Sequence, residues 1–201
     1  MPKIGIDLDG TVADYLKNAI PFVKEAYGVD PDFSKPAYSI EEVFGFTPET
    51  RPKDIRTRLY VEKRLFRHLQ KLEEDNNQLT SVLASEIPDL KIYFVTARDS
   101  HPITLEDTRH WLNNNTDCFN DVFHVHQITK ADFCIAAGIS VLIEDEVKQA
   151  LKAVEKGIHV ICMDQPWNRD VEQTVPPTSP GKIIRVSGWR EAVSAAKEFL
   201  L

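Results

Sequence analysis

Two aspartates two residues apart are the strongest chemical signal in the sequence. They stand in the run Asp7-Leu8-Asp9-Gly10-Thr11, directly after a short apolar segment. Two carboxylates at the end of a strand can approach one divalent cation, and Gly10 allows a turn that brings the backbone close to a ligand such as phosphate. The alternative is an ordinary turn capped by Asp and Gly. At about 5% usage per residue type, chance produces this pattern only about once in a thousand such chains, which favours a site.

Three further polar positions follow or precede other apolar segments. Thr96 ends one segment, where a hydroxyl can donate a hydrogen bond to a phosphoryl oxygen. Lys130 opens a helical pattern, and its ammonium can neutralise a carboxylate and an incoming phosphate, although a lysine at a helix start is usually only solvated. Glu144 and Asp145 end another apolar run. Acids at the mouth of a buried strand carry a desolvation cost unless a cation or hydrogen-bond donors offset it.

The apolar pattern predicts the elements that position these residues. Six segments, mostly rich in Ile and Val, are typical of strands covered on both faces: 4–7, 92–96, 122–125, 141–144, 160–163 and 183–186. Apolar residues three or four apart predict helices between and after the later strands: 105–112, 130–137, 147–156 and 189–200. Strands that alternate with helices predict an α/β fold with a doubly wound, mainly parallel sheet.

One long insertion separates the first strand from the second. Residues 14–90 form a connection that is far longer than the single crossover helix that usually joins two parallel strands. Helical patterns at 14–27, 52–66 and 69–86 predict a small helical cap over the sheet. We therefore expect a core formed by 1–13 and 91–201, and a cap formed by 14–90.

The cap contains the most basic part of the chain. Between residues 51 and 71 there are eight basic residues and two acidic ones. This excess predicts either a solvated helix face or an electrostatic funnel for an anionic substrate.

Composition excludes several classes of protein. The chain has 201 residues, of which 42% are hydrophobic and 27% charged, which is typical of a globular protein rather than a disordered or membrane-spanning one. A net charge of −7 argues against binding to a nucleic-acid polymer. The first residues lack the apolar stretch of a signal peptide, and no run is long enough to span a membrane. We expect a cytoplasmic protein with a small-molecule partner and no membrane contact.

The four sets of residues, in this chain order and each after a predicted strand, resemble the four motifs of the haloacid dehalogenase superfamily of phosphohydrolases. The resemblance covers essentially the whole chain, with 14–90 in the place of that superfamily's helical cap. It implies that Asp7 attacks phosphorus to form an aspartyl-phosphate, while Asp9 protonates the leaving oxygen and later activates water. It also implies that three residues bind the phosphoryl group: Thr96, Lys130 and Gly10.

The resemblance further implies Mg²⁺ as the cofactor. The ion would be held by the carboxylates of Asp7 and Asp145 and by the backbone carbonyl of Asp9. Many relatives have aspartate at the position of Glu144, and the longer side chain suits an outer role, through a metal-bound water.

Motif spacing and cap size resemble the 5′(3′)-deoxyribonucleotidase branch, which includes nucleotidases of bacteria and phages. This resemblance implies a small phosphorylated substrate, a nucleoside monophosphate. Tyr15 and Phe44 of the cap are candidates to stack on its base. Trp167 lies in a Pro-aromatic-Asn-Arg loop similar to one in those nucleotidases, and it either contacts the substrate or packs under the loop.

Two other functions fit part of the pattern. One is a phosphatase or phosphomutase acting on another small phosphate, such as a sugar phosphate, which a substrate panel separates from a nucleotidase. The other is a phospho-accepting signalling module of the receiver type, whose phosphorylated aspartate follows the third strand rather than the first. A binding protein that has lost catalysis is disfavoured, because no motif residue is missing.

Overall fold

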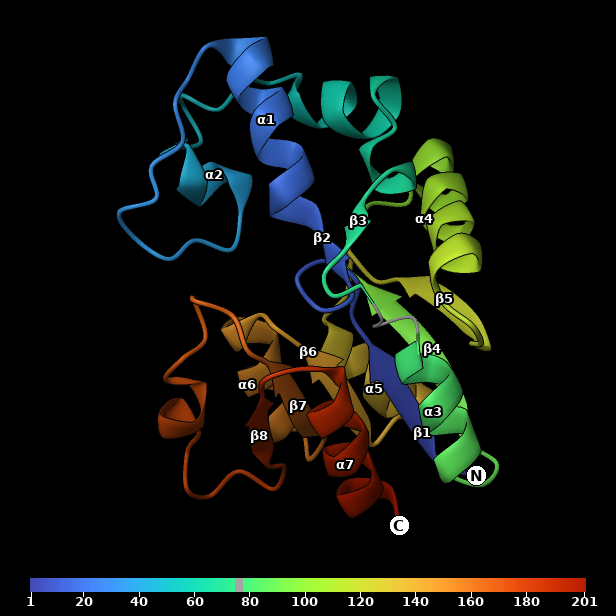
Figure 1. Cartoon of the computed structure of the whole chain (residues 1–201). Helices are drawn as coiled ribbons and strands as arrows, with labels where there is room; N and C mark the ends of the chain where they lie inside the picture. Colours follow the sequence, from blue (N-terminus) through green and yellow to red (C-terminus); the bar gives the residue numbers. More distant parts are fainter. Residues whose placement is uncertain (75–77) are drawn as a thin grey trace.

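A six-stranded parallel sheet lies at the centre of the computed structural model, which describes residues 1–74 and 78–201 (Figure 1). Its strands, in the order β5-β4-β1-β6-β7-β8, are β1 (Lys3–Ile6), β4 (Lys91–Thr96), β5 (Asp121–His124), β6 (Val141–Glu144), β7 (His159–Met163) and β8 (Ile183–Val186). Neighbouring strands are parallel throughout. The predicted α/β fold is confirmed, and each predicted strand is found within one residue of its predicted ends.

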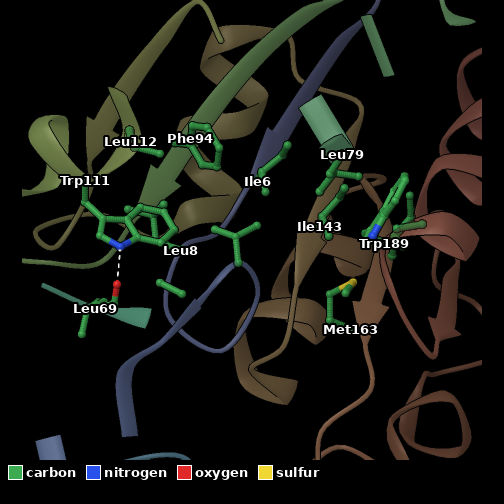
Figure 2. Packing of buried hydrophobic residues seen from close by; sticks show 14 of the residues in the cluster. Ile6, Leu8, Leu69, Leu79, Phe94, Trp111, Leu112, Ile143, Met163 and Trp189 are labelled. Carbon is green, nitrogen blue, oxygen red and sulfur yellow. Dashed lines mark hydrogen bonds between the residues drawn. The ribbon is translucent and has the colours of Figure 1, made fainter. Parts of the chain in front are cut away.

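Helices cover both faces of the sheet, which explains why its strands are continuously apolar. On one face, Ile6 and Phe94 pack with Trp111, Leu112 and Trp189 in the layer drawn in Figure 2. The helices of this layer are α3 (Gln78–Glu86), α4 (Pro102–Asn115) and α7 (Trp189–Leu200). The opposite layer contains α5 (Lys130–Ala137) and α6 (Val147–Glu155), and a short 3₁₀ helix, η3 (Val171–Thr174), precedes β8.

Strand β1 lies in the middle of the sheet, between β4 and β6. Its residue Ile6 is in register with Phe94 of β4 and with Ile143 of β6. The residues that follow these three strands therefore emerge side by side at one edge.

No helix in the described ranges has both the length and the apolar character needed to cross a membrane.

The cap is joined to the core by a two-stranded antiparallel ribbon, β2 (Ala13–Asp14) and β3 (Gln70–Lys71). Between these strands lie α1 (Tyr15–Tyr27), α2 (Ile40–Val43), the π-helix η1 (Thr57–Glu62) and the 3₁₀ helix η2 (Leu65–Arg67), at the top of Figure 1. Helix α1 ends as predicted at Gly28, which has a left-handed φ of 65° and donates its N–H to Lys24. The single helix predicted at 52–66 is instead divided at Arg64, whose φ is 53°.

The segment predicted as one helix at 69–86 contains two different elements. Its first part forms β3, because Gln70 and Lys71 pair with β2. Residues 75–77 of that prediction lie outside the described residues. Its last part is α3, which buries Leu79 and Leu83 and contacts β4 and α7. We therefore propose that α3 belongs to the core unit, and that the cap is confined to the stretch between β2 and β3.

Candidate active site

A cavity of about 430 Å³ lies between the strand ends and the cap. Its core wall includes Asp7, Asp9, Thr96, Arg98, Lys130 and Asp145. Its cap wall includes Tyr15, Tyr38, Glu41, Arg56, Tyr60 and Phe66. The structure thus brings six of the predicted site residues into one pocket, five on the core wall and Tyr15 on the cap wall. The volume is typical of a site for a small molecule.

Lys130 joins two buried acids at the base of this cavity. Its Nζ lies 2.8 Å from Oδ1 of Asp7 and 2.7 Å from Oε2 of Glu144. Asp7 directly follows β1, and its N–H donates to the carbonyl of Ile143 on β6, so the sheet itself sets its position. Lys130 opens α5, whose first turn is capped by the side chain of Thr129. The structure therefore places the ammonium of Lys130 beside Asp7, while the catalytic roles of both residues stay predictions.

Asp7, Glu144 and Asp145 form one acidic cluster, with ligand oxygens within 4.8 Å of one another. Burial and the charge of Glu144 raise the pKa of Asp7 to about 8, against the opposing effect of Lys130. Burial, Glu144 and Asp7 raise the pKa of Asp145 well above its ordinary value. Burial lowers the pKa of Lys130, but the two carboxylates outweigh this effect and raise it overall. Asp7 and Asp145 therefore hold their protons more tightly than ordinary aspartates, because the three buried acids crowd around one ammonium.

The cluster has the chemistry of a divalent-cation site. Ionisation of all three carboxylates beside one ammonium would leave two negative charges uncompensated, and a divalent cation carries the opposite charge. An all-oxygen donor set is the type that Mg²⁺, Ca²⁺ and Mn²⁺ prefer. Glu144 is less available than the two aspartates, because Oε1 accepts the N–H groups of Asp145 and Glu146 while Oε2 accepts Lys130.

Gly10 allows the loop after β1 to approach Asp145. Its φ is 80°, and a Cβ at this position would lie 2.2 Å from Oδ2 of Asp145. The neighbouring Thr11 donates from Oγ1 to Oδ1 of the same carboxylate, at 3.2 Å. The close approach predicted for Gly10 is therefore an approach to an acid of the cluster; its contact with phosphate stays a prediction.

The loop after β7 also contacts Asp145. Trp167 donates its indole N–H to Oδ2 of Asp145 at 3.2 Å, and Asn168 donates to the backbone carbonyl of Asp145 at 2.9 Å. Gln165 donates to the carbonyl of Gly10 at 2.8 Å. Trp167 is not part of the wall of the 430 Å³ cavity. The indole N–H of Trp167 thus points at a buried carboxylate of the acidic cluster, and its contact with substrate stays a prediction.

Thr96 and Asp9 are connected through Arg98. Thr96 is buried at the end of β4, and its Oγ1 accepts the backbone N–H of Arg98 at 3.2 Å, which leaves its hydroxyl hydrogen free to donate. The guanidinium of Arg98 holds both carboxylate oxygens of Asp9, at 2.9 and 2.6 Å. Sequence reasoning assigned no role to Arg98. The available signal was an arginine two residues beyond a strand-ending threonine.

Of the two aromatic residues predicted in the cap, one lies in the cavity. Tyr15 lines it, and its hydroxyl is 2.9 Å from that of Tyr60, which was not predicted. Phe44 lies in the interior of the cap, 7% exposed and stacked on Phe46, and not in the cavity wall. The prediction of a base contact for Phe44 is corrected, because the residue directly follows α2 and its ring lies in the apolar centre of the cap.

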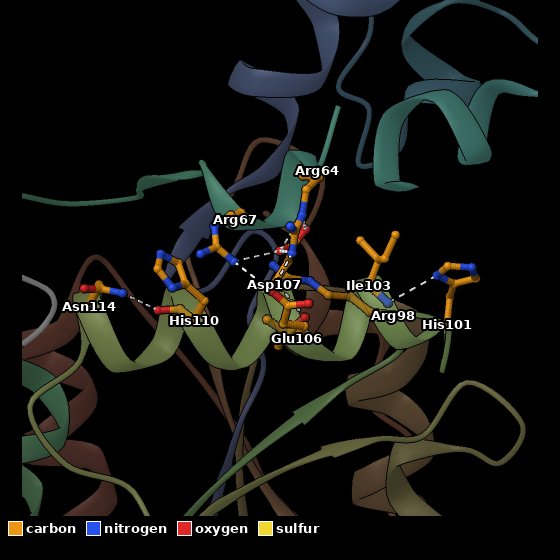
Figure 3. A network of polar contacts seen from close by, with 10 residues as sticks. Arg64, Arg67, Arg98, His101, Ile103, Glu106, Asp107, His110 and Asn114 are labelled. Carbon is orange, nitrogen blue, oxygen red and sulfur yellow. Dashed lines mark hydrogen bonds and ion pairs between the residues drawn. The ribbon is translucent and has the colours of Figure 1, made fainter. Parts of the chain in front are cut away.

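Most of the basic segment contributes little to the cavity. Arg64 and Arg67 form ion pairs with Glu106 and Asp107 on α4 (Figure 3), and Arg51 pairs with Glu41. Of the eight basic residues between 51 and 71, all in the described part of the chain, Arg56 alone lines the cavity. Of the electrostatic funnel that the basic segment predicted, only Arg56 therefore lies at the cavity.

Comparison with known proteins identifies one family over nearly the whole chain. The family model described as 5′ nucleotidase, deoxy (pyrimidine), cytosolic type C protein matches residues 1–196. A search of curated proteins found no match.

Similar solved structures include a HAD family hydrolase from Deinococcus radiodurans with bound phosphate and sodium, at 13% identity and a TM-score of 0.56, covering 99% of this chain and 97% of that chain. A family IA, variant 3 HAD hydrolase from Entamoeba histolytica has 13% identity and a TM-score of 0.57, with 98% and 100% covered. A mutant of CbbY from Rhodobacter sphaeroides, in complex with xylulose-(1,5)bisphosphate, has 14% identity and a TM-score of 0.57, with 95% and 96% covered. At these identities the likeness concerns the fold.

Proposed function

The chain belongs to the cytosolic type C family of 5′-nucleotidases and is a phosphatase, and from this premise we propose that it is a Mg²⁺-dependent 5′-nucleotidase acting on (deoxy)nucleoside monophosphates through an aspartyl-phosphate. The observation that carries the proposal is that Asp7, Thr96 and Lys130 share one cavity with the aromatic wall of the cap. We also propose a cytoplasmic location, in keeping with the description of the family.

Asp7 is the proposed nucleophile. A carboxylate oxygen of Asp7 forms a bond to phosphorus, and the bond from phosphorus to the leaving oxygen breaks. Lys130 lies 2.8 Å from Asp7 and favours its ionised form. Mg²⁺, when bound by Asp7 and Asp145 with Glu144 in an outer role, would favour ionised Asp7 and neutralise charge on the phosphoryl oxygens. The same ion would balance the charge of the acidic cluster.

Asp9 is the proposed acid and base. It gives its proton to the leaving oxygen in the first step and takes a proton from the attacking water in the second. Thr96 donates its hydroxyl to a phosphoryl oxygen, and Lys130 binds another through its ammonium. All of these side chains line the cavity.

The cap wall suits the nucleoside part of the substrate. Tyr15, Tyr60 and Phe66 supply aromatic surface, which can pack against a base. Glu41 and Arg56, whose charged atoms are 4.0 Å apart, supply hydrogen-bond partners for base or sugar. A sugar phosphate is the second candidate, since one structure of similar fold was solved with a sugar bisphosphate.

A phosphate-release screen with Asp7→Asn tests the proposal. We expect wild-type protein to release phosphate from nucleoside monophosphates faster than from sugar phosphates, and only with Mg²⁺. Asp7→Asn keeps the shape of the side chain but removes the nucleophile's charge, so turnover should fall by more than about 1,000-fold. Thermal unfolding of the variant serves as the folding control. Near-normal turnover by Asp7→Asn would refute the nucleophile assignment, and a preference for sugar phosphates would refute the substrate class.

A further inference from the structure

One buried arginine holds the proposed acid–base residue. Arg98 donates to both carboxylate oxygens of Asp9, from Nε at 2.9 Å and from Nη2 at 2.6 Å. Two parallel hydrogen bonds from a planar guanidinium define both the position and the plane of a carboxylate. The side chain of Arg98 is 2% exposed, whereas that of Asp9 is 28% exposed and lines the cavity. Arg98 is thus a buried support for a group that faces the substrate pocket.

The guanidinium of Arg98 is itself restrained from the core and from the cap. Its remaining nitrogen, Nη1, donates to Oγ1 of Thr108 on α4 at 3.1 Å. Its central carbon lies 4.1 Å from the ring centroid of Phe66, which belongs to η2 of the cap. Every nitrogen of the guanidinium therefore has a partner, and one face of the group is covered.

The same cap segment is attached to α4 next to Thr108. Asp107 is fully buried and accepts hydrogen bonds from Arg64 at 3.1 Å and from Arg67 at 3.3 Å. Figure 3 shows both arginines reaching from the cap to this helix, with Arg98 beside them. Arg98 consequently lies in a slot with α4 on one side and the cap segment 64–67 on the other.

We propose that Arg98 is a positioning residue that aims the carboxyl group of Asp9 at the leaving oxygen, and that the cap segment 64–67 maintains the orientation of Arg98. The inference rests on the proposed function. In the first step Asp7 bonds to phosphorus, the bond to the leaving oxygen breaks, and the proton of Asp9 moves to that oxygen. In the second step a water oxygen bonds to phosphorus, its proton moves to Asp9, and the bond between phosphorus and Asp7 breaks.

Two substrates with different leaving groups test the role of Arg98. The 5′-oxygen that leaves a nucleoside 5′-monophosphate needs a proton to depart, because its alkoxide is a poor leaving group. By contrast, 4-nitrophenolate departs readily as an anion. Single-turnover release of each leaving group, with enzyme in excess and Mg²⁺ present, reports the first step alone. Arg98→Lys keeps the positive charge but cannot make two parallel bonds. We expect its rate to fall by about 100-fold with the nucleotide and by less than about threefold with 4-nitrophenyl phosphate.

Three further variants make the test specific. Asp9→Asn removes the proton itself and serves as the reference, so it should show the same selectivity. Thr108→Val removes only the hydroxyl that holds Nη1, and Arg64→Gln, outside the cavity wall, removes one ion pair by which the cap segment 64–67 is attached to Asp107 beside Thr108. We expect both to lose about three- to tenfold with the nucleotide and to keep most of the rate with the aryl substrate. Thermal unfolding identifies any variant that fails to fold. If Arg98→Lys fails to fold, the result for Thr108→Val decides whether Arg98 positions Asp9.

The contrary outcomes can be told apart. Equal losses with both substrates in Arg98→Lys and Thr108→Val would overturn the positioning role and leave the proposed function intact. Wild-type rates in Arg98→Lys would also overturn it, because charge without the paired geometry would then suffice. Wild-type rates in Arg64→Gln would overturn the part assigned to the cap. If the folded wild-type protein released neither leaving group, the proposed function would fall, and this inference with it.

Discussion

At the scale of single residues, Gly10 occupies a position that only a residue without a side chain can occupy. Its left-handed φ of 80° brings the loop after β1 against the carboxylate of Asp145, where a Cβ would lie only 2.2 Å from Oδ2. Gly28 has a similar φ of 65° but open space around it. The two glycines therefore share a backbone requirement and differ in what lies beside them.

This difference makes Gly28→Ala a matched control for Gly10→Ala. Both substitutions place a Cβ at positive φ and should lower the free energy of unfolding by about 1 kcal/mol or more. Only Gly10→Ala displaces Asp145, so its affinity for Mg²⁺ should fall by at least about tenfold. Urea denaturation measures the first effect and calorimetric titration with Mg²⁺ the second. Equal Mg²⁺ affinities in the two variants would contradict the role given to Gly10.

At the scale of elements, the site is formed by loops that follow different strands of the sheet. The loop after β7 connects two of them, since Gln165 donates to Gly10 after β1 and Trp167 donates to Asp145 after β6. Hydrogen-bond donors behind a metal-binding carboxylate orient it and tune its affinity for the ion. We therefore expect Trp167 to orient Asp145 in the proposed metal site.

Trp167→Phe tests this arrangement. The substitution keeps an aromatic ring but removes the N–H that Asp145 accepts, so we expect the affinity for Mg²⁺ to fall by about tenfold. Isothermal titration calorimetry measures the dissociation constant directly, without reference to turnover. Arg169→Ala, at an exposed position of the same loop, should bind Mg²⁺ as the wild-type protein does. Unchanged affinity in Trp167→Phe would mean that the indole contact has no part in metal binding.

At the scale of the whole molecule, the acidic cluster links stability to pH. The pKa of Asp7 in the folded protein is about 8, above its ordinary value of 3.8, so the folded state holds this proton more tightly than the unfolded state. The stabilisation is complete below about pH 4 and is lost as pH rises through about 8. The raised pKa of Asp145 acts in the same direction.

We therefore expect the metal-free protein to lose stability between pH 6 and 8. The contribution of Asp7 to the free energy of unfolding should fall by up to about 1 kcal/mol per pH unit. Excess Mg²⁺ binds the ionised carboxylates, so it should stabilise the protein more at pH 8 than at pH 6. Chemical denaturation in chelator and in Mg²⁺ measures both effects, with Asp7→Asn as the control that lacks this titration. A wild-type slope no steeper than that of Asp7→Asn would rule out the assigned titration.

The strands, most of the helices and the acidic motifs could be predicted because each depends on residues close together in sequence. A run such as Val141-Leu142-Ile143 is apolar on both faces wherever it lies in the sheet, and Asp7 follows its strand by one position. The parallel order then brings Asp7, Thr96 and Asp145 to one edge. These features of the chain were determined by its sequence alone.

The roles of Arg98, Phe44 and Trp167 were decided by tertiary structure. Arg98 meets Asp9 across 89 positions of sequence, and the indole of Trp167 meets a carboxylate across 22. Tyr15 and Phe44 are both aromatic residues with an apolar neighbour in the sequence, and the packing of the cap places Tyr15 in the cavity wall and Phe44 in the interior. Local periodicity reports which face of an element is apolar, but a hydrogen bond between distant segments depends on how those segments pack, and only the folded chain contains that information.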